Sequence, residues 1–250
     1  MGAVNTGWSL DIKNQSWVED TENQVDFIIN TLELTGKERI LDLACGFGRH
    51  SISLARRGFS VVGIDYTKDF IDDAVITAKS ASLQIDFILS DIRDIKFENE
   101  FDVVLNLADG AIGYLETDEE NLKIFDAVSK ALKPGGKHFM DICNAEHAEI
   151  CFPKRSWDIG SKTLSLPEFD WDKEKRRMLF TDWVITFGEI ARKPAKTEKD
   201  TKGIRLYSKP ELDSILSERH MKIIKTFSNY YGKEASYKEL QLMVYSIKNK

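Results

Sequence analysis

Three observations predict an α/β domain whose mostly parallel sheet is flanked by helices. Apolar runs of strand length alternate with helical stretches from about residue 17 to residue 142, as in consecutive βαβ units. The run at 60–64 has no charged residue, as expected of a central parallel strand. At 250 residues the chain is long for one minimal domain and short for two equal ones. We therefore expect a single domain that carries an insertion.

Periodicity and helix-ending residues give the elements of the first part of the chain. An amphipathic helix is expected over 17–34, ended by Gly36, with an inward face made of Val25, Phe27, Ile28, Ile29 and Leu32. Strands are expected at 39–43, 60–64, 85–89, 101–105 and 137–142, and helices at 49–57, 67–80 and 118–132. The stretch 91–100 is too short for a crossover helix, and the sequence KPGG at 133–136 predicts a turn.

Beyond residue 150 the pattern changes to that of antiparallel strands. Segments 162–169 and 176–187 are rich in Leu, Phe, Trp and Thr, and the turn between them is expected at 170–173. Residues 191–203 read as a solvated loop. A helix at 210–217 and strands at 222–227 and 240–247 then follow.

Composition narrows the class of protein. Hydrophobic residues make up 42% of the chain and charged residues 30%, as in ordinary soluble globular proteins. No apolar run approaches the roughly 18 residues of a membrane-spanning helix, and the N-terminus lacks a signal-peptide pattern. The three cysteines, Cys45, Cys143 and Cys151, are odd in number and lack metal-ligand spacing. We therefore expect a cytoplasmic protein with no disulfide framework, no metal site and no membrane partner.

Charge is divided unevenly between the two parts of the chain. Residues 1–150 hold 14 Lys and Arg against 27 Asp and Glu, whereas residues 151–250 hold 21 against 14. An acidic first part suits a cationic or neutral ligand better than a phosphate chain. Duplex nucleic acid is therefore an unlikely partner.

Polar residues follow the predicted strands at the edge where ligands of parallel sheets bind. Gly46 and Gly48 lie where the first strand turns into a helix, so bare backbone can approach a ligand there. Asp65 ends the second strand, 19 residues after Gly46, at the position from which a carboxylate reaches ribose hydroxyls. Asp91 follows the third strand and suits an adenine amino group. A second polar turn begins at Asn106, after the fourth strand.

Two residues argue against a nicotinamide cofactor. Ser51 stands where a dinucleotide fold has its third glycine, and Asp42 places a negative charge just before the turn. A pyrophosphate would be repelled by that carboxylate, whereas a ligand bearing an ammonium and a sulfonium would be attracted.

With these features the chain resembles the class I S-adenosylmethionine-dependent methyltransferases, in a bacterial-type branch that acts mainly on small molecules. DLACGFGRH at 42–50 is similar to their first motif, and IDYT at 64–67 to the acidic end of their second strand. SDIRD at 90–94, FDVVLNLADGAIGYL at 101–115 and ALKPGGKHFMDI at 131–142 are similar to their next three motifs. The similarity continues over 205–232, where His220-Met221 departs from the usual Gly-Phe.

The resemblance implies a Rossmann-like sheet of seven strands in the order 3-2-1-4-5-7-6, with strand seven antiparallel and an antiparallel β insertion after strand five. It implies one methyltransferase domain over 1–250: an N-terminal cap helix (1–36), a cofactor-binding core (37–150), a lid insertion (151–204) and a completion of the sheet (205–250).

The resemblance also implies a cofactor site for S-adenosylmethionine. Asp42 would orient its amino group, the turn of Ala44, Cys45, Gly46 and Gly48 would pass its methionine part, and Asp65 would hold its ribose. Tyr66 would pack on adenine, Asp91 and the Ile92 backbone would read the adenine edge, and Asn106 and Leu107 would lie beneath the methyl donor.

The expected reaction is methyl transfer to an N, O or S atom of a small molecule by in-line displacement. Tyr114 and His147 lie where an acceptor would dock, and either is a candidate catalytic residue. An RNA or protein methyltransferase stays open as an alternative because the second part of the chain is basic. A nicotinamide-dependent oxidoreductase is the weaker alternative. The oligomeric state and the identity of the acceptor stay undetermined.

Overall fold

The structure is a computed structural model, and it describes residues 9–188 and 203–250. The predicted loop at 191–203 lies outside the described residues except for Gly203.

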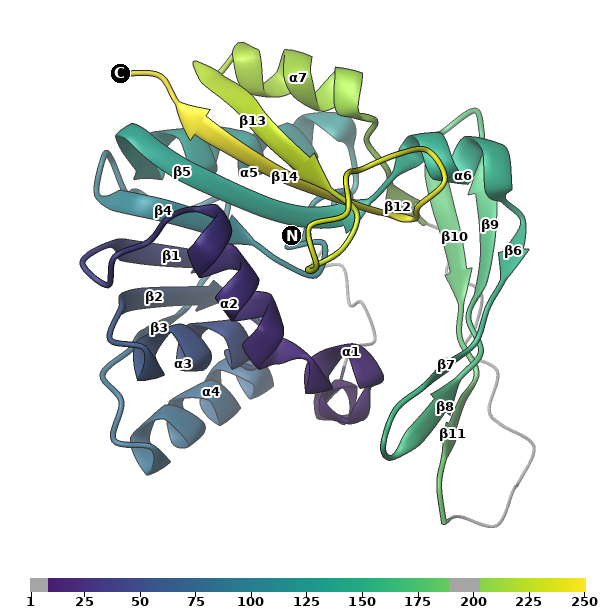
Figure 1. Ribbon diagram of the computed structural model, residues 1–250, viewed down its shortest axis with the longest axis horizontal. Coiled ribbons are helices and arrows are strands. Elements are labelled where there is room, and N and C mark those ends of the chain that lie inside the picture. The colour runs from purple at the N-terminus through teal and green to yellow at the C-terminus, as the bar shows by residue number, and fades with distance from the viewer. Residues whose placement is uncertain (1–8, 189–202) are drawn as a thin grey trace.

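A seven-stranded sheet forms the centre of the molecule (Figure 1), in the order β13-β14-β5-β4-β1-β2-β3. Its strands are β1 (Arg39–Leu43), β2 (Ser60–Asp65), β3 (Asp86–Leu89), β4 (Phe101–Asn106), β5 (Leu132–Cys143), β13 (Met221–Phe227) and β14 (Gln241–Lys248). Neighbours from β3 to β5 pair in parallel, and β14 pairs antiparallel with both β5 and β13. This confirms the predicted order and the antiparallel last strand.

Helices cover both faces of the sheet because successive strand residues point to opposite sides. On one face, side chains of α2 (Thr21–Thr31) and α3 (Arg49–Arg56) form a core with Ile40, Val103 and Phe139. On the other, side chains of α5 (Asp118–Ala131) and α7 (Lys209–Ser217) form a core with strand residues that alternate with the first set. Helix α4 (Lys68–Ser80) packs against α3, β2 and β3.

Local signals fix where the outer helices begin. Thr117 caps α5 by accepting from the backbone N–H of Glu120, and three acidic residues in the first turn favour the positive end of the helix dipole. Ser208 and Glu211 form a capping box at the start of α7, which also has Pro210 in its first turn.

The predicted turn at 133–136 is part of β5, which begins directly after α5. The pairing with β4 shifts register there: Phe101 lies opposite Leu132, whereas Val103 lies opposite Lys137. The extra residues form an irregularity within the strand, because Pro134 lacks a backbone N–H and Gly135 has a φ of +79°. The prediction of a separate turn was wrong.

The predicted helix at 17–34 is wrong in its extent. It is divided into α1 (Ser16–Glu19) and α2, preceded by a 3₁₀ turn, η1 (Leu10–Asn14). Asp20 separates the two helices, and the chain leaves α2 through Leu32 and Glu33, the latter with a φ of +50°. The apolar face was predicted correctly, since Val25, Ile28 and Leu32 are buried.

The segment after β5 extends away from the sheet to one side of the molecule (Figure 1). It starts with α6 (Ala145–Cys151), which the sequence analysis missed because its seven residues are too few to show a helical period. Two small sheets follow. One has the order β12-β10-β9-β6 and the other β11-β8-β7. Their strands are β6 (Lys154–Arg155), β7 (Asp158–Ile159), β8 (Thr163–Ser165), β9 (Glu168–Asp172), β10 (Arg177–Thr181), β11 (Val184–Thr186) and β12 (Ile204–Arg205).

The antiparallel pairing of this segment was predicted, but the position of its turn was not. Strand β9 continues through Asp172, so the β9–β10 turn lies at residues 173–176 instead of 170–173. Trp171 lies in the strand because it packs against the apolar cluster that joins this segment to α6.

The far end of this segment returns to the N-terminal helices, as Figure 1 shows for α1, β7 and β8. Glu19 accepts hydrogen bonds from the backbone N–H and the hydroxyl of Ser161, at 2.8 and 2.7 Å. Thr163 donates to the Asn14 carbonyl at 3.1 Å. We call residues 158–163 the arm tip. The arm tip and the N-terminal segment therefore meet through polar groups, of which Glu19 and Ser161 are exposed and Thr163 is buried.

Candidate functional site

The turn between β1 and α3 presents backbone to the carboxyl edge of the sheet. Ala44, Gly46 and Gly48 have φ values of +54°, +56° and +75°, which direct the chain sharply into the helix. A Cβ on Gly46 would meet only a ring carbon of Phe70, at 3.9 Å, so this face of the turn is open. A Cβ on Gly48 would lie 2.8 Å from the Phe87 ring, so Gly48 is required for packing. Cys45 is buried and donates its N–H to the Ile64 carbonyl at 2.9 Å.

Asp65 joins this turn to the end of β2. Its carboxylate accepts from the N–H of Gly46 at 2.9 Å and from the N–H of Thr67 at 2.8 Å. A carboxylate has about four acceptor positions, so these two bonds leave capacity for further donors. The predicted ribose-binding residue thus lies beside the glycine turn, where sequence spacing placed it.

Asp42 lies on β1, just before the glycine turn. It is buried, and its Oδ2 accepts from the Ser51 hydroxyl at 2.6 Å. Burial raises the pKa of Asp42 to about 6, and the nearby Asp65 adds to this effect, whereas Ser51 and Arg49 oppose it. A cation that approached the turn would be favoured by this carboxylate.

The sequence analysis predicted Arg49 only as the first residue of a helix. In the structure its guanidinium supplies a positive charge beside the β1–α3 turn. Its Nη1 donates to Thr21 and Gln24 at 2.7 and 2.6 Å, and its guanidinium lies 5.0 Å from the Trp17 ring centroid. Burial lowers the pKa of Arg49 to about 10, and the surrounding Tyr230, Asp141 and Asp42 oppose that shift. A half-buried cation and a buried carboxyl group therefore lie on either side of the same turn.

Asp91, the residue predicted to bind the adenine edge, is already hydrogen-bonded to Arg93. Asp91 is held by Arg93, whose backbone N–H and Nε donate to Oδ1 at 2.9 and 3.0 Å, so the pKa of Asp91 is lowered. Arg93 also pairs with Glu120. Ile92 is buried, while Tyr66 is 45% exposed beyond the end of β2. The sequence analysis overlooked Arg93 because its partners come from two segments of the chain.

Asn106, at the end of β4, is fully buried and supports the loop that follows it. Its Nδ2 donates to the Gly110 carbonyl at 3.0 Å, and its Oδ1 lies 3.2 Å from Nε2 of His138. Burial lowers the pKa of His138 to about 3, so this imidazole is neutral at pH 7. Leu107 is buried beside it. The side chain of Asn106 therefore positions the loop through its own bonds.

That loop holds its residues in an uncommon backbone conformation. Ala108, Asp109 and Ala111 have φ values of +51°, +67° and +64°. The N–H of Asp109 donates to the Asp141 carbonyl at 2.8 Å, and the hydroxyl of Tyr114 donates to Asp109 Oδ2 at 2.9 Å. Burial and the proximity of Asp141 raise the pKa of Asp109 to about 6.

Asp141, near the end of β5, is a fifth carboxyl group at this edge, and the sequence analysis did not select it. It accepts from the Tyr230 hydroxyl at 2.7 Å and from Gln241. Burial raises the pKa of Asp141. Its position after a buried parallel strand, as for Asp65, was a usable sequence signal.

The two candidate catalytic residues lie in different surroundings. Tyr114 reaches Asp109, whereas His147 is buried in α6 with Nδ1 3.0 Å from the Tyr237 carbonyl. Burial lowers the pKa of His147, and Lys154 lies 3.4 Å from its Nε2. The structure does not bring His147 to the carboxyl groups described above.

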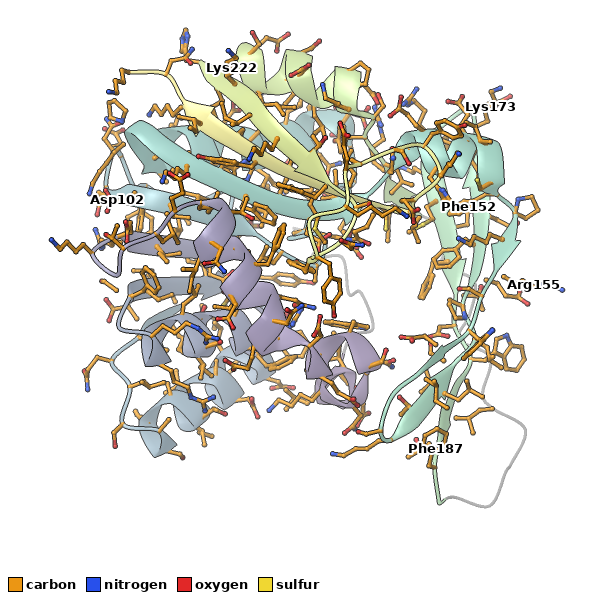
Figure 2. All side chains as sticks on the ribbon, in the orientation of Figure 1. Asp102, Phe152, Arg155, Lys173, Phe187 and Lys222 are labelled. Carbon is orange, nitrogen blue, oxygen red and sulfur yellow. The ribbon has the colours of Figure 1, made fainter. Side chains whose placement is uncertain are left out.

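Figure 2 shows the two ends of the parallel strands on opposite sides of the molecule. Asp102, near the start of β4, lies on the far side of the sheet from Phe152, which follows α6. The carboxyl groups described above lie at or just beyond the carboxyl ends of β1, β2, β3, β4 and β5. This is where open α/β sheets bind their ligands.

Two further classes of site are not seen in the described part of the chain. Among residues 9–188 and 203–250, no group of three or more His, Cys, Asp and Glu side chains is arranged to hold a metal ion. None of the described helices combines the length and apolar composition that crossing a bilayer requires.

Comparisons with known proteins agree with this architecture. Residues 40–136 match the family model described as a methyltransferase domain. YqeM of Bacillus subtilis (strain 168), a methyltransferase by name, is 38% identical over 133 residues, 53% of each chain. A ubiquinone biosynthesis O-methyltransferase of Xanthomonas oryzae pv. oryzae (strain PXO99A) is 32% identical over 143 residues, 56% of this chain and 57% of the relative. The chain thus spans just over half the length of these curated relatives.

The similarity in structure extends further than the similarity in sequence. A crystal structure of an S-adenosylmethionine-dependent methyltransferase from Clostridium acetobutylicum superposes with a TM-score of 0.76, at 17% identity, over 96% of this chain and 97% of the other. Residues 40–136 therefore resemble a methyltransferase domain in sequence, and the chain as a whole has the fold of the class I S-adenosylmethionine-dependent methyltransferases.

Proposed function

We propose that the chain transfers the methyl group of S-adenosylmethionine to an N, O or S atom of a small-molecule acceptor. One observation carries the proposal: the open backbone of Gly46 is held by the carboxylate of Asp65 at the carboxyl edge of the sheet, between the buried carboxyl group of Asp42 and the half-buried guanidinium of Arg49. This arrangement suits a ligand with a diol at one end and a zwitterion at the other.

The residues present fit each part of the cofactor. Asp65 has acceptor capacity left for the ribose hydroxyls, and Tyr66, Asp91 and Ile92 lie on the β2–β3 side, where adenine would bind. Gly46 leaves space for the methionine chain, with Ala44, Cys45 and Gly48 shaping the turn.

The zwitterionic end would be bound on both sides of this turn. Asp42 would attract the ammonium group, and Arg49 would bind the carboxylate, since a partly desolvated guanidinium gains most from a charged partner. When bound, the cofactor supplies an activated methyl group on a sulfonium.

The methyl end would then lie toward β4, since adenine occupies the β2–β3 side. The loop after Leu107 and the insertion that rises from β5 meet at that end, where Tyr114 packs against the cluster of Ala148, Phe169 and Met178. We propose the insertion as a lid over the acceptor. Holding donor and acceptor in line and excluding water supplies a large part of the rate enhancement in such reactions.

The name of the Xanthomonas relative supports a small-molecule acceptor, since it refers to ubiquinone biosynthesis. An RNA or protein acceptor is the alternative, supported only by the basic composition of residues 151–250. A nicotinamide-dependent oxidoreductase is disfavoured because Asp42 and Ser51 form a hydrogen-bonded pair where a pyrophosphate would need a positive field.

Two experiments test the proposal. Thermal stabilisation by S-adenosylhomocysteine is expected and stabilisation by NAD is not; the opposite pattern would favour an oxidoreductase. Methyl-labelled S-adenosylmethionine is then incubated with the protein and either metabolite pools or RNA. Label in a low-molecular-weight product is the expected result, and label only in RNA or protein would contradict the acceptor class.

A further inference from the structure

The pair Asp109–Tyr114 lies between the cofactor loops and the insertion. Asp109 belongs to the loop that leaves β4, and its backbone N–H is fixed to the Asp141 carbonyl on β5 at 2.8 Å. Tyr114 contacts the apolar cluster of α6 and the insertion while its hydroxyl donates to Asp109 at 2.9 Å. With adenine on the β2–β3 side, this pair is on the side where donor and acceptor must meet.

Asp109 differs from Asp42 and Asp141 in its access. Asp141 is buried and accepts from Tyr230 and Gln241, and Asp42 is buried against Ser51. Asp109 is half-buried; Tyr114 and the thiol and backbone N–H of Cys143 donate to it. Three donors leave about one acceptor position of a carboxylate for a substrate proton.

We propose that Asp109 is the general base that takes the proton of the methyl acceptor, and that Tyr114 is its positioning residue. This inference rests on the proposed function. It restricts the acceptor to a molecule whose nucleophilic atom carries a hydrogen, such as an amine or a hydroxyl group.

The proton and the electron pairs balance in this step. Asp109 accepts the proton of the acceptor atom while the lone pair of that atom forms the bond to the methyl carbon. The electron pair of the broken carbon–sulfur bond stays on sulfur. Asp109 returns its proton to solvent before the next turnover, so no oxidant or reductant is needed.

The electrostatic surroundings of Asp109 suit a base that works near neutral pH. Asp141 and Cys143 face it from β5, and Tyr114 faces it from its own loop. Tyr230 and Arg49 do not face Asp109 directly; they oppose the rise in the pKa of Asp141. The raised pKa of Asp109, about 6, leaves the carboxylate ionised at pH 7 and still basic enough to hold a proton.

The test uses the full chain and three variants: Asp109→Asn, Tyr114→Phe and, as a matched control, Asp213→Asn on α7, an exposed carboxylate on the other face of the sheet. Calorimetry with S-adenosylhomocysteine comes first. Affinity within about threefold of wild type is expected for all three, since none contacts the proposed cofactor. If the wild type does not bind, the proposed function fails; if only Asp109→Asn does not bind, Asp109 belongs to the cofactor site and the proposal is overturned.

The second readout needs no acceptor. Carbon-13 NMR of aspartate-labelled, cofactor-free protein is expected to show a carboxyl group that titrates near pH 6 and is absent from Asp109→Asn. Asp42→Asn identifies the signal of Asp42, which is expected in the same range. In Tyr114→Phe the Asp109 titration moves to higher pH, because the lost hydrogen bond stabilised the charged form. An Asp109 signal at its ordinary pKa overturns the proposal.

The third readout is turnover with the labelled acceptor fraction. The wild-type rate is expected to fall as pH drops through about 6. Asp109→Asn loses about 100-fold or more in kcat and lacks this acid limb. Tyr114→Phe retains the limb at a higher pH, and Asp109→Glu, which keeps the carboxyl group, recovers part of the activity. Wild-type kcat in Asp109→Asn overturns the proposal.

Discussion

Asp65 stabilises two loops with one carboxyl group, and the same group is proposed to bind the ribose. Asp65→Ala should weaken S-adenosylhomocysteine binding about ten- to a hundredfold, since lost charged hydrogen bonds cost about 1.5–3 kcal/mol. Calorimetry measures this. Asp69→Ala, an exposed aspartate on α4, is the control. An unchanged affinity in folded Asp65→Ala would show that Asp65 only holds the N–H groups of Gly46 and Thr67.

The two glycines of the β1–α3 turn should respond differently to a methyl group. Gly48→Ala places a Cβ 2.8 Å from Phe87, so urea unfolding should show a loss of about 2–3 kcal/mol. Gly46→Ala meets only Phe70 at 3.9 Å and should cost about 1–2 kcal/mol through its positive φ. Calorimetry should nevertheless find the larger loss of cofactor affinity in Gly46→Ala. Equal affinities would mean that the open face of Gly46 is not a ligand surface.

Asp42 is expected to reduce stability at neutral pH. The folded pKa of about 6 lies above the ordinary 3.8, so the folded protein holds this proton more tightly than the unfolded chain. The associated stability is complete below pH 4 and is lost as pH rises through about 6. Asp42→Asn should therefore gain about 1–3 kcal/mol relative to wild type between pH 4 and pH 7. Urea unfolding at several pH values measures this, and a difference that does not change with pH would contradict the burial argument.

At the scale of elements, the arm tip should depend on Glu19. Removing its carboxylate leaves the N–H and hydroxyl of Ser161 without this acceptor. Hydrogen exchange of residues 158–165 should become several-fold faster in Glu19→Ala, while the central sheet keeps its protection. Glu98→Ala, an exposed glutamate, is the control. Unchanged exchange would show that the arm tip does not depend on Glu19 and is held by its other contacts, such as the bond from Thr163 to the Asn14 carbonyl.

Elements with strong local signals were predictable from the sequence, whereas those set by distant contacts were not. The strands from β1 to β4 follow from apolar runs, and α5 follows from its cap and acidic first turn. By contrast, α6 has only seven residues, and its position depends on the cluster formed with Phe169 and Met178. The 133–136 irregularity depends on pairing with β4, which no local pattern contains.

The same distinction applies to the site. Asp42, Gly46 and Asp65 could be placed at the carboxyl edge from the sequence because the spacing between strand ends and turns is fixed by the fold. Arg49 was overlooked because the charges around it come from β1, β5 and the β13–β14 connection, which meet only in the folded chain. The imidazole of His147 contacts the Tyr237 carbonyl, and a catalytic role for it stays a prediction.

For the whole molecule, the two apolar cores lie on opposite faces of one sheet. Strand β14 pairs with β5 on one side and β13 on the other, while β5 and β13 do not pair with each other. Val244, in its middle, is fully buried. Both β13 and the outer edge of β5 therefore depend on this single strand.

This arrangement matters for a chain that is synthesised from its N-terminus. Every loop of the proposed cofactor site has left the ribosome well before residues 241–248, yet the outer edge of β5 has no pairing partner until they arrive. An unpaired edge is a row of free N–H and C=O groups that another nascent chain can join. While the stretch from β5 to β14 is being translated, the free edge of β5 is therefore a site at which nascent chains can associate.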